Sequence, residues 1–444
     1  MTQTHTCAAI LISAPASGQG KTTIVSALAR LHTRQGRRVR VFKCGPDFLD
    51  PIWHQLACGH PVYQMDLWIT GEADAKARLH AAAKDCDLII VEGVMGLFDG
   101  EPSAADLADC FDLPVLAVID ASAMAGTFGA LAFGLQHYRP GLKWAGVLAN
   151  RVASDQHGSM LAQSVSSDNW LGALMRNSAL TLPERHLGLT VATELSDAMK
   201  RLDAAADALQ QTPLGQMDVD ALSRWHVDFP APDERALVPT LLQGRRVAVA
   251  RDAAFCFIYQ ANLDMLRQLG AETVFFSPVN GDALPECDAV WLPGGYPELH
   301  AQQLARHHEM RASLRAHVDQ GLPVWAECGG MMVLFDEIEC VDGDAHTMWG
   351  LLPGRVQMQQ RLAALGSQQL TLPLGVLRGH TFHYSTATSS ARVVTRTARP
   401  NNTVAQDAGE AVYVHRGLRA SYFHPWFASC PEAAASLFLP EAST

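Results

Sequence analysis

The sequence predicts an α/β protein of two domains, each built on a mostly parallel sheet flanked by helices. Short apolar runs typical of buried parallel strands alternate with amphipathic stretches typical of helices. At 444 residues, the chain also exceeds the size at which one hydrophobic core usually stops growing. We therefore expect a first domain over 1–225, a linker over 226–243 and a second domain over 244–444.

In the first domain, the apolar runs predict six buried strands with helices between them. The expected helices include 22–35 and 73–83, and the expected strands are 8–12, 39–42, 88–91, 115–119, 145–148 and 171–174. A sheet of this kind binds ligands at the carboxyl ends of its strands. The motifs described below all follow such strand ends.

A change of pattern marks the expected linker. The segment Asp228-Phe229-Pro230-Ala231-Pro232-Asp233 carries prolines and charges and is followed by another charged, proline-containing stretch. A second α/β series then begins, with strands expected at 246–250, 273–276, 289–292 and 323–326.

Composition excludes several classes of function. The hydrophobic fraction of 48% and the charged fraction of 18% are those of an ordinary globular protein, and no apolar run is long enough to span a bilayer. A net charge of -11 argues against a nucleic-acid partner, because binding to the phosphate backbone needs clustered Lys and Arg. The first seven residues lack the features of a secretory signal, so we expect a cytoplasmic protein without membrane insertion.

A phosphate-binding loop follows the first expected strand. In the segment SGQGKTT, 17–23, two close glycines precede a lysine that opens a helix. Backbone N–H groups at such a helix start can bind phosphate oxygens, the lysine can reach the β and γ phosphates, and the next hydroxyl can ligate Mg²⁺. The strict GxxxxGK[ST] pattern is not met, because Pro15 occupies its first glycine position. The residues expected to bind nucleotide are Gly18, Gly20, Lys21, Thr22, Thr23 and Asn150, the last by recognising the base from the end of strand 145–149.

Four acidic residues follow two other strands. They lie in the segments KCGPDFLDP, 43–51, and EGVMGLFDG, 92–100. Carboxylates repel polyphosphate unless a cation lies between them, so we expect bridging Mg²⁺. We assign metal coordination to Asp47 and Glu92 together with Thr22. The outer metal environment or the substrate is assigned to Asp50 and Asp99, and the acceptor pocket to Phe48 and Leu49.

A cysteine on a glycine turn lies in the second domain. Cys328 follows the strand 323–326 and precedes two glycines, which is typical of a strained strand-to-helix turn that exposes a nucleophile. The segment PGGYPE, 293–298, follows another strand and offers backbone N–H groups. We expect the oxyanion hole at Gly294, Gly295 and Gly329.

Eighteen histidines compete for the role of the base that activates Cys328. The segment ASYFHPWF, 420–427, resembles the closing motif of class I glutamine amidotransferase domains, and this resemblance assigns the base to His424. Many members carry a glutamate two residues after that histidine, where this chain has Trp426. His380 and His383 are weaker candidates for the base, and the third member of the site stays open.

Taken in order, SGQGKTT, KCGPDFLDP, VEGVMGLFDG, LANRV and PERHLGL resemble the first half of the cobyrinic acid a,c-diamide synthase family, which is related in this half to dethiobiotin synthetase. The resemblance implies a class I glutamine amidotransferase-like second domain. It also implies a reaction in which ATP, with Mg²⁺, phosphorylates a corrinoid acetate and ammonia from L-glutamine displaces the phosphate. The family does this on the a and c acetates of cobyrinic or hydrogenobyrinic acid.

Two alternatives remain at this point. One is an amidase of another acidic tetrapyrrole, such as nickel-sirohydrochlorin; a cobyric acid synthase fits the paired acidic motifs less well. The other is a MinD- or ParA-like ATPase switch whose second domain is degenerate, although Ala16 and Ser17 stand where that class has an extra lysine. The sequence leaves open whether the protein forms a homodimer and whether the substrate contains cobalt.

Overall fold

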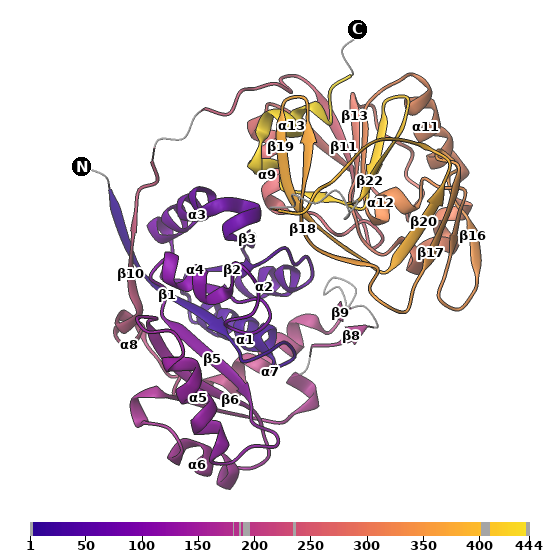
Figure 1. The fold of residues 1–444 in the computed structure, drawn as a ribbon. Helices are drawn as coiled ribbons and strands as arrows, with labels where there is room; N and C mark the ends of the chain where they lie inside the picture. Colours follow the sequence, from indigo (N-terminus) through magenta and orange to yellow (C-terminus); the bar gives the residue numbers. More distant parts are fainter. Residues whose placement is uncertain are drawn as a thin grey trace. The chain divides into compact units, whose positions relative to one another are not determined.

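Two compact units, Met1–Arg235 and Ala236–Thr444, make up the chain in the computed structural model (Figure 1). The structure describes residues 3–180, 182–185, 188–189, 196–233, 237–400 and 409–440. Each unit contains a large, mostly parallel sheet covered by helices, which confirms the predicted α/β class. No helix within these described ranges is long and apolar enough to cross a membrane.

The first unit is organised around a sheet of the order β3-β2-β4-β1-β5-β6-β7, in which all these neighbours are parallel. Its strands are β1 Thr4–Ser13, β2 Val39–Cys44, β3 Tyr63–Met65, β4 Leu88–Glu92, β5 Val115–Asp120, β6 Trp144–Val152 and β7 Trp170–Met175. Every apolar run predicted in this unit lies within one of these strands. The short edge strand β3 was not predicted.

Helices cover both faces of this sheet. They are α1 Lys21–Arg34, α2 Asp50–Cys58, α3 Glu72–Asp85, α4 Ala104–Cys110, α5 Thr127–His137, α6 Asp155–Gln163, α7 Ala198–Gln210 and α8 Val219–Leu222. Alternate β1 side chains enter two cores: Ile10 packs on the side of α1, α2 and α7, whereas Leu11 packs on the side of α3 to α6. A short hairpin, β8 Glu184–Arg185 and β9 Gly188–Leu189, precedes α7.

The start of the expected linker is structured, and our expectation for residues 226–230 was wrong. They form β10 His226–Pro230, which pairs antiparallel with the beginning of β1 in a register from Ala8 opposite His226 to Thr4 opposite Pro230. Val227 and Phe229 alternate with exposed neighbours and are buried, so the strand contributes to the core in spite of its terminal proline. The first unit therefore closes on its own first strand.

The second unit contains a sheet of the order β12-β11-β13-β14-β23-β22-β21. Its first five members pair in parallel, and β22 pairs antiparallel with both β23 and β21. The strands are β11 Arg246–Ala250, β12 Glu272–Phe276, β13 Ala289–Leu292, β14 Val324–Glu327, β21 Arg392–Arg396, β22 Ala411–His415 and β23 Leu418–Ser421. The four apolar runs predicted here correspond to β11, β12, β13 and β14.

Two smaller sheets and several helices complete the second unit. The sheets are β16-β15-β17-β20 and β18-β19-β24, from strands β15 Glu337–Glu339, β16 Ala345–Thr347, β17 Gly354–Met358, β18 Ala364–Leu372, β19 Gly375–His383, β20 Ser385–Ser389 and β24 His424–Pro425. The helices are α9 Gln260–Gln268, α10 Ala301–Arg306, α11 His308–Asp319, α12 Gly329–Met332 and α13 Pro431–Ser436. Figure 1 shows α13 in the yellow, C-terminal part of the chain. Through β24 the small sheet brings the last histidine of the chain against β19.

Candidate active site

The loop that we expect to bind phosphate connects β1 to α1, which confirms its predicted place between a strand and a helix. Gly18 and Gly20 have φ angles of 76° and 93°, which other residues rarely adopt. Lys21, the first residue of α1, is buried, and its Nζ donates to the carbonyls of Ala16 at 3.3 Å and Met95 at 2.6 Å. Burial and the nearby Lys43 lower the pKa of Lys21, against the opposing charges of neighbouring carboxylates. The loop thus brings a lysine and the start of a helix to one place.

Asn150 lies against this loop. Its Nδ2 donates to the Gln19 carbonyl at 2.8 Å, and a Cβ on Gly20 would lie 2.3 Å from that nitrogen. Gly20, Thr23 and Asn150 all line a cavity of about 420 Å³ at the carboxyl ends of β5, β6 and β7. Such a cavity is large enough for a nucleoside. Three of the predicted nucleotide-binding residues therefore meet at one cavity.

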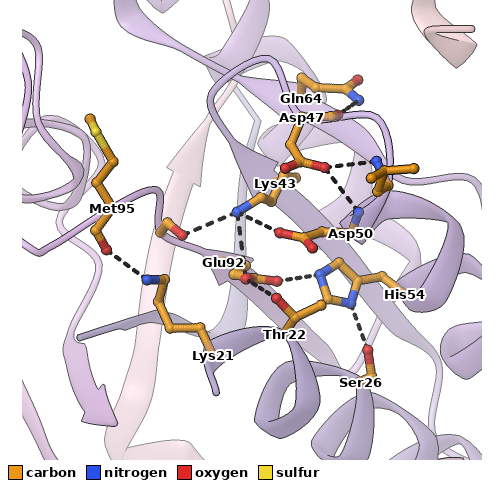
Figure 2. Close-up of polar contacts among 12 residues, drawn as sticks. Lys21, Thr22, Ser26, Lys43, Asp47, Asp50, His54, Gln64, Glu92 and Met95 are labelled. Carbon is orange, nitrogen blue, oxygen red and sulfur yellow. Dashed lines mark hydrogen bonds and ion pairs between the residues drawn. The ribbon is translucent and has the colours of Figure 1, made fainter. Parts of the chain in front are cut away.

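A buried polar network surrounds Thr22 and Glu92, next to this loop (Figure 2). The Thr22 hydroxyl donates to Glu92 Oε1 at 2.9 Å, and Lys43 Nζ lies 3.5 Å from the same oxygen. Lys43 also pairs with Asp50 Oδ2 at 3.1 Å. Burial alone would lower the pKa of Lys43, but Glu92 and Asp50 outweigh it and raise that pKa above its usual range, so the ammonium stays charged.

His54 of α2 completes this network. Its Nε2 contacts Glu92 Oε2, and its Nδ1 lies 2.9 Å from the Ser26 hydroxyl (Figure 2). Burial would raise the pKa of Glu92, whereas Lys43 and His54 lower it, to about 2. Glu92 is therefore an anionic residue in the folded protein, as a cation ligand must be.

Asp47 caps the start of α2: its Oδ1 accepts from the backbone N–H groups of Leu49 at 2.7 Å and Asp50 at 2.9 Å. Burial, with Asp47 and Glu92 nearby, raises the pKa of Asp50 well above its usual range. Phe48 and Leu49 are half-buried between the two acids.

Asp99 lies farther along the chain, in the turn after β4, where its Oδ2 accepts from Gly96 N–H at 3.0 Å. Burial lowers the pKa of Lys21, and the charges of Glu92, Asp50 and Asp99 only partly offset this effect. The structure thus brings three of the predicted acids to the end of the phosphate-binding loop.

These side chains can supply part of the coordination sphere of a magnesium ion. Thr22 Oγ1 and Glu92 Oε1 are hard oxygen donors 2.9 Å apart. Among the described residues, no group of three or more His, Cys, Asp or Glu could hold a metal ion alone. Mg²⁺ usually keeps waters and phosphate oxygens around one or two protein ligands, so a donor pair of this kind suits it.

In the second unit, Cys328 lies between β14 and α12 with φ 45° and ψ -108°. Such a conformation costs a residue other than glycine about 1–3 kcal/mol and is typical of functional turns. The turn has the strained form that the sequence predicts. Burial raises the pKa of the Cys328 thiol, and the carboxylate of Glu298 adds to this effect. Because the resting thiol is protonated, its reaction as a nucleophile needs a base.

The three predicted oxyanion-hole glycines lie close together. A Cβ on Gly329 would lie 3.0 Å from Gly295 N, and a Cβ on Gly294 would lie 2.5 Å from His424 Cε1. Only glycine at 294 and 329 permits this approach of the two backbones and the imidazole. The segments that follow β13 and β14 therefore meet beside His424.

His424 is almost fully buried. Its ring stacks on that of His380, with centroids 5.0 Å apart, and its Nδ1 lies 3.3 Å from Glu327 Oε2. Glu327 immediately precedes Cys328. This contact was not predicted.

Sequence reasoning missed several residues of these sites. Asp120 and Arg176 line the same cavity as Asn150, and each lies at the end of an apolar strand, which is the pattern that identified the four predicted acids. His54 lies four residues after Asp50 on one helix, a spacing that indicates a shared face. Of the segment 183–189, part of the family resemblance, residues 186 and 187 lie outside the described residues.

Comparisons with known proteins agree with this arrangement. The CobQ/CobB/MinD/ParA nucleotide binding domain family matches residues 10–189, and the CobB/CobQ-like glutamine amidotransferase domain family matches residues 246–431. The chain is 53% identical to a hydrogenobyrinate a,c-diamide synthase of Pseudomonas aeruginosa, over 99% of both chains. It is 55% identical to one of Stutzerimonas stutzeri, over 98% of this chain and 99% of the relative. A cobyrinate a,c-diamide synthase of Herminiimonas arsenicoxydans is 46% identical over 99% of this chain and 98% of its own. The chain therefore belongs to the family of hydrogenobyrinate and cobyrinate a,c-diamide synthases, glutamine-hydrolysing amidoligases with an N-terminal nucleotide-binding domain.

Proposed function

We propose that this protein converts the a and c acetate side chains of hydrogenobyrinic or cobyrinic acid into amides, using ATP and L-glutamine. The observation that carries the proposal is the presence in one chain of a loop at a helix start with buried acids around it and, in the second unit, of a cysteine on a strained turn and a buried histidine. Relatives that match nearly the whole chain are named for this reaction.

In the first unit, we assign phosphate binding to the backbone of Gly18 and Gly20 and to Lys21 and Thr23. Lys21 now donates to two backbone carbonyls and could exchange the Met95 carbonyl for a phosphate oxygen. Asn150 would bind the base in the cavity that it lines. The carboxylate oxygen of an acetate attacks the γ-phosphorus, the bond to ADP breaks and an acyl phosphate forms.

For Mg²⁺, we propose Thr22, Glu92 and Asp47 as protein ligands. When bound, the ion neutralises the charge that develops on the transferred phosphoryl group. Thr22 and Glu92 already share a hydrogen bond at this place, and Glu92 is held anionic. Asp47 would present the carboxylate oxygen that does not cap α2.

On the acceptor side, we assign Asp50, Asp99, Phe48 and Leu49. Lys43 pairs with Glu92 and Asp50, and its positive charge lowers the electrostatic repulsion between these acids and the phosphates. The two half-buried apolar residues, Phe48 and Leu49, would contact the macrocycle.

In the second unit, the Cys328 thiol gives its proton to His424 while its sulfur attacks the glutamine carboxamide carbon. The N–H groups of Gly294, Gly295 and Gly329 would bind the oxygen that becomes negative. The C–N bond then breaks, His424 returns the proton to the leaving ammonia, and water hydrolyses the thioester to glutamate. Ammonia attacks the acyl phosphate, and phosphate leaves.

The experiment that tests this proposal compares two variants with two nitrogen donors. Cobyrinic and hydrogenobyrinic acids are incubated in parallel with ATP, Mg²⁺ and either glutamine or ammonium, and amides are counted by mass. Cys328→Ser should lose glutamine-dependent amidation and keep ammonium-dependent amidation. Lys21→Met should lose both and keep glutamine hydrolysis. Unchanged ammonia release from glutamine by Cys328→Ser, or the absence of a two-amide product from both corrinoids, would refute the proposal.

A further inference from the structure

The environment of His424 contains a carboxylate that comes from an unexpected position. His424 Nδ1 lies 3.3 Å from Glu327 Oε2, and both side chains are almost fully buried, at 1% and 2% exposure. Many class I glutamine amidotransferases supply such a carboxylate from the position two residues after the histidine. In this chain that position is Trp426, which is fully buried and packs against Tyr259 with ring centroids 5.2 Å apart. Trp426 therefore serves the core, and the carboxylate comes from β14.

The carboxylate of Glu327 is fixed in place by two indoles. Trp291 Nε1 and Trp325 Nε1 both donate to Glu327 Oε1 at 2.8 Å. The two tryptophans are opposite one another in the β13–β14 pairing, and Trp325 and Glu327 share one face of β14 because they are two residues apart. With Oε1 bound in this way, Oε2 is directed at the imidazole.

We infer that Glu327 is the positioning residue that orients His424 and selects its tautomer, in place of the acid that Trp426 replaces. This inference rests on the proposed glutamine hydrolysis. A carboxylate accepts, so Nδ1 must carry the proton, and the lone pair is then on Nε2, where it can take the proton of the Cys328 thiol. Glu327 also stabilises the imidazolium that forms, without taking a proton itself.

A second histidine–carboxylate pair in the same unit does not fit this role. His383 Nε2 lies 3.1 Å from Glu410 Oε1, but His383 Nδ1 also contacts the Ser385 carbonyl at 2.8 Å. Both ring nitrogens of His383 therefore face acceptors, and neither lone pair is available for a thiol proton. The two pairs offer matched variants: Glu327→Gln should damage catalysis and Glu410→Gln should not.

The test measures glutamine hydrolysis and ammonium-dependent amidation for both variants. For Glu327→Gln we expect kcat for glutamine to fall by about 100-fold or more, with KM changed less than about threefold and ammonium-dependent amidation retained. For Glu410→Gln, kcat should stay within about fivefold of the unmodified enzyme. In the His424→Ala background, Glu327→Gln should add nothing, because a residue that acts through His424 has no further effect once the imidazole is gone. A full and additive loss in that background, or a loss in Glu410→Gln but not in Glu327→Gln, would overturn the inference.

A measurement on the unmodified enzyme covers the case in which Glu327→Gln does not fold. Nitrogen-15 NMR of labelled histidine, with the His424 signals assigned by their disappearance in His424→Gln, reports which ring nitrogen carries the proton. We expect the Nδ1–H tautomer, and an Nε2–H tautomer would overturn the inference. If Cys328→Ser loses glutamine hydrolysis while these tests fail, the role of Glu327 is wrong and the proposed function stands. If Cys328→Ser hydrolyses glutamine normally, the proposed function itself is wrong.

Discussion

A single methyl group at position 294 should inactivate glutamine hydrolysis. The ideal Cβ of Gly294→Ala would lie 2.5 Å from His424 Cε1, where ordinary contacts between carbons are about 3.5–4.0 Å. Gly294 is not among the positive-φ glycines of the structure, so alanine adds this contact without backbone strain. The imidazole must then move by about 1 Å.

His424 has little room for such a movement. It is 1% exposed, it stacks on His380, and its ring centroid is 6.4 Å from that of Phe257. A shift also disturbs the 3.3 Å contact with Glu327. Because a misplacement of about 1 Å can cost 100-fold in rate, we expect kcat for glutamine to fall about 100-fold, or about 2.7 kcal/mol in the activation barrier.

The assay measures glutamate formation for kcat and KM, and ammonium-dependent amidation as an internal check that the protein is folded. Gly134→Ala, on α5, is the matched control, since no atom lies within 4 Å of its ideal Cβ. An unchanged kcat in Gly294→Ala, with ammonium-dependent activity intact, would refute the placement of His424 as the base. A loss of both activities would indicate overpacking of the unit, which typically costs about 1–3 kcal/mol of stability.

Two further predictions concern the first unit. Thr22→Val removes the hydroxyl 2.9 Å from Glu92 and should raise the Mg²⁺ concentration needed for half-maximal amidation about tenfold. Thr33→Val, on the same helix, should leave that concentration unchanged, because the Thr33 hydroxyl has no hydrogen-bond partner in the described part of the chain. An equal Mg²⁺ requirement in both variants would contradict the assignment of Thr22. Burial and Arg37 lower the pKa of His32 from 6.5 to about 4, so the unfolded chain binds a proton that the folded protein excludes, and stability should fall by up to about 3 kcal/mol as the pH drops through this range. His32→Leu should flatten this dependence in denaturant titrations between pH 6.5 and 4, and parallel profiles for the two proteins would count against it.

Much of the fold could be predicted because buried parallel strands appear in the sequence as local apolar runs. The turn at Cys328 was predictable for the same reason, since a strand followed by a cysteine and two glycines is a local pattern. The three-residue strand β3 was not predicted, because an edge strand needs no apolar run.

The contact between Glu327 and His424 could not be predicted, because it joins residues 97 apart through the pairing of β14 with its neighbours. In sequence, Glu327 is simply the last residue of a strand. Its role becomes visible only when two indoles and an imidazole surround it. Lys43 is similar: its charge is explained by acids that other strands bring to it.

The pairing of β10 with β1 has a consequence for how the first unit can be cut and rejoined. Thr4 and Pro230 are opposite one another in that ladder, so the beginning and end of the unit lie one strand spacing apart, about 5 Å. A short linker could join these ends, and new termini could be opened in a surface loop elsewhere. A fragment that ends at residue 225 would lack β10 and expose the start of β1, whereas one that ends just beyond Pro230 keeps the ladder. The first unit is in this sense a closed module, and its boundary is set by a strand pairing.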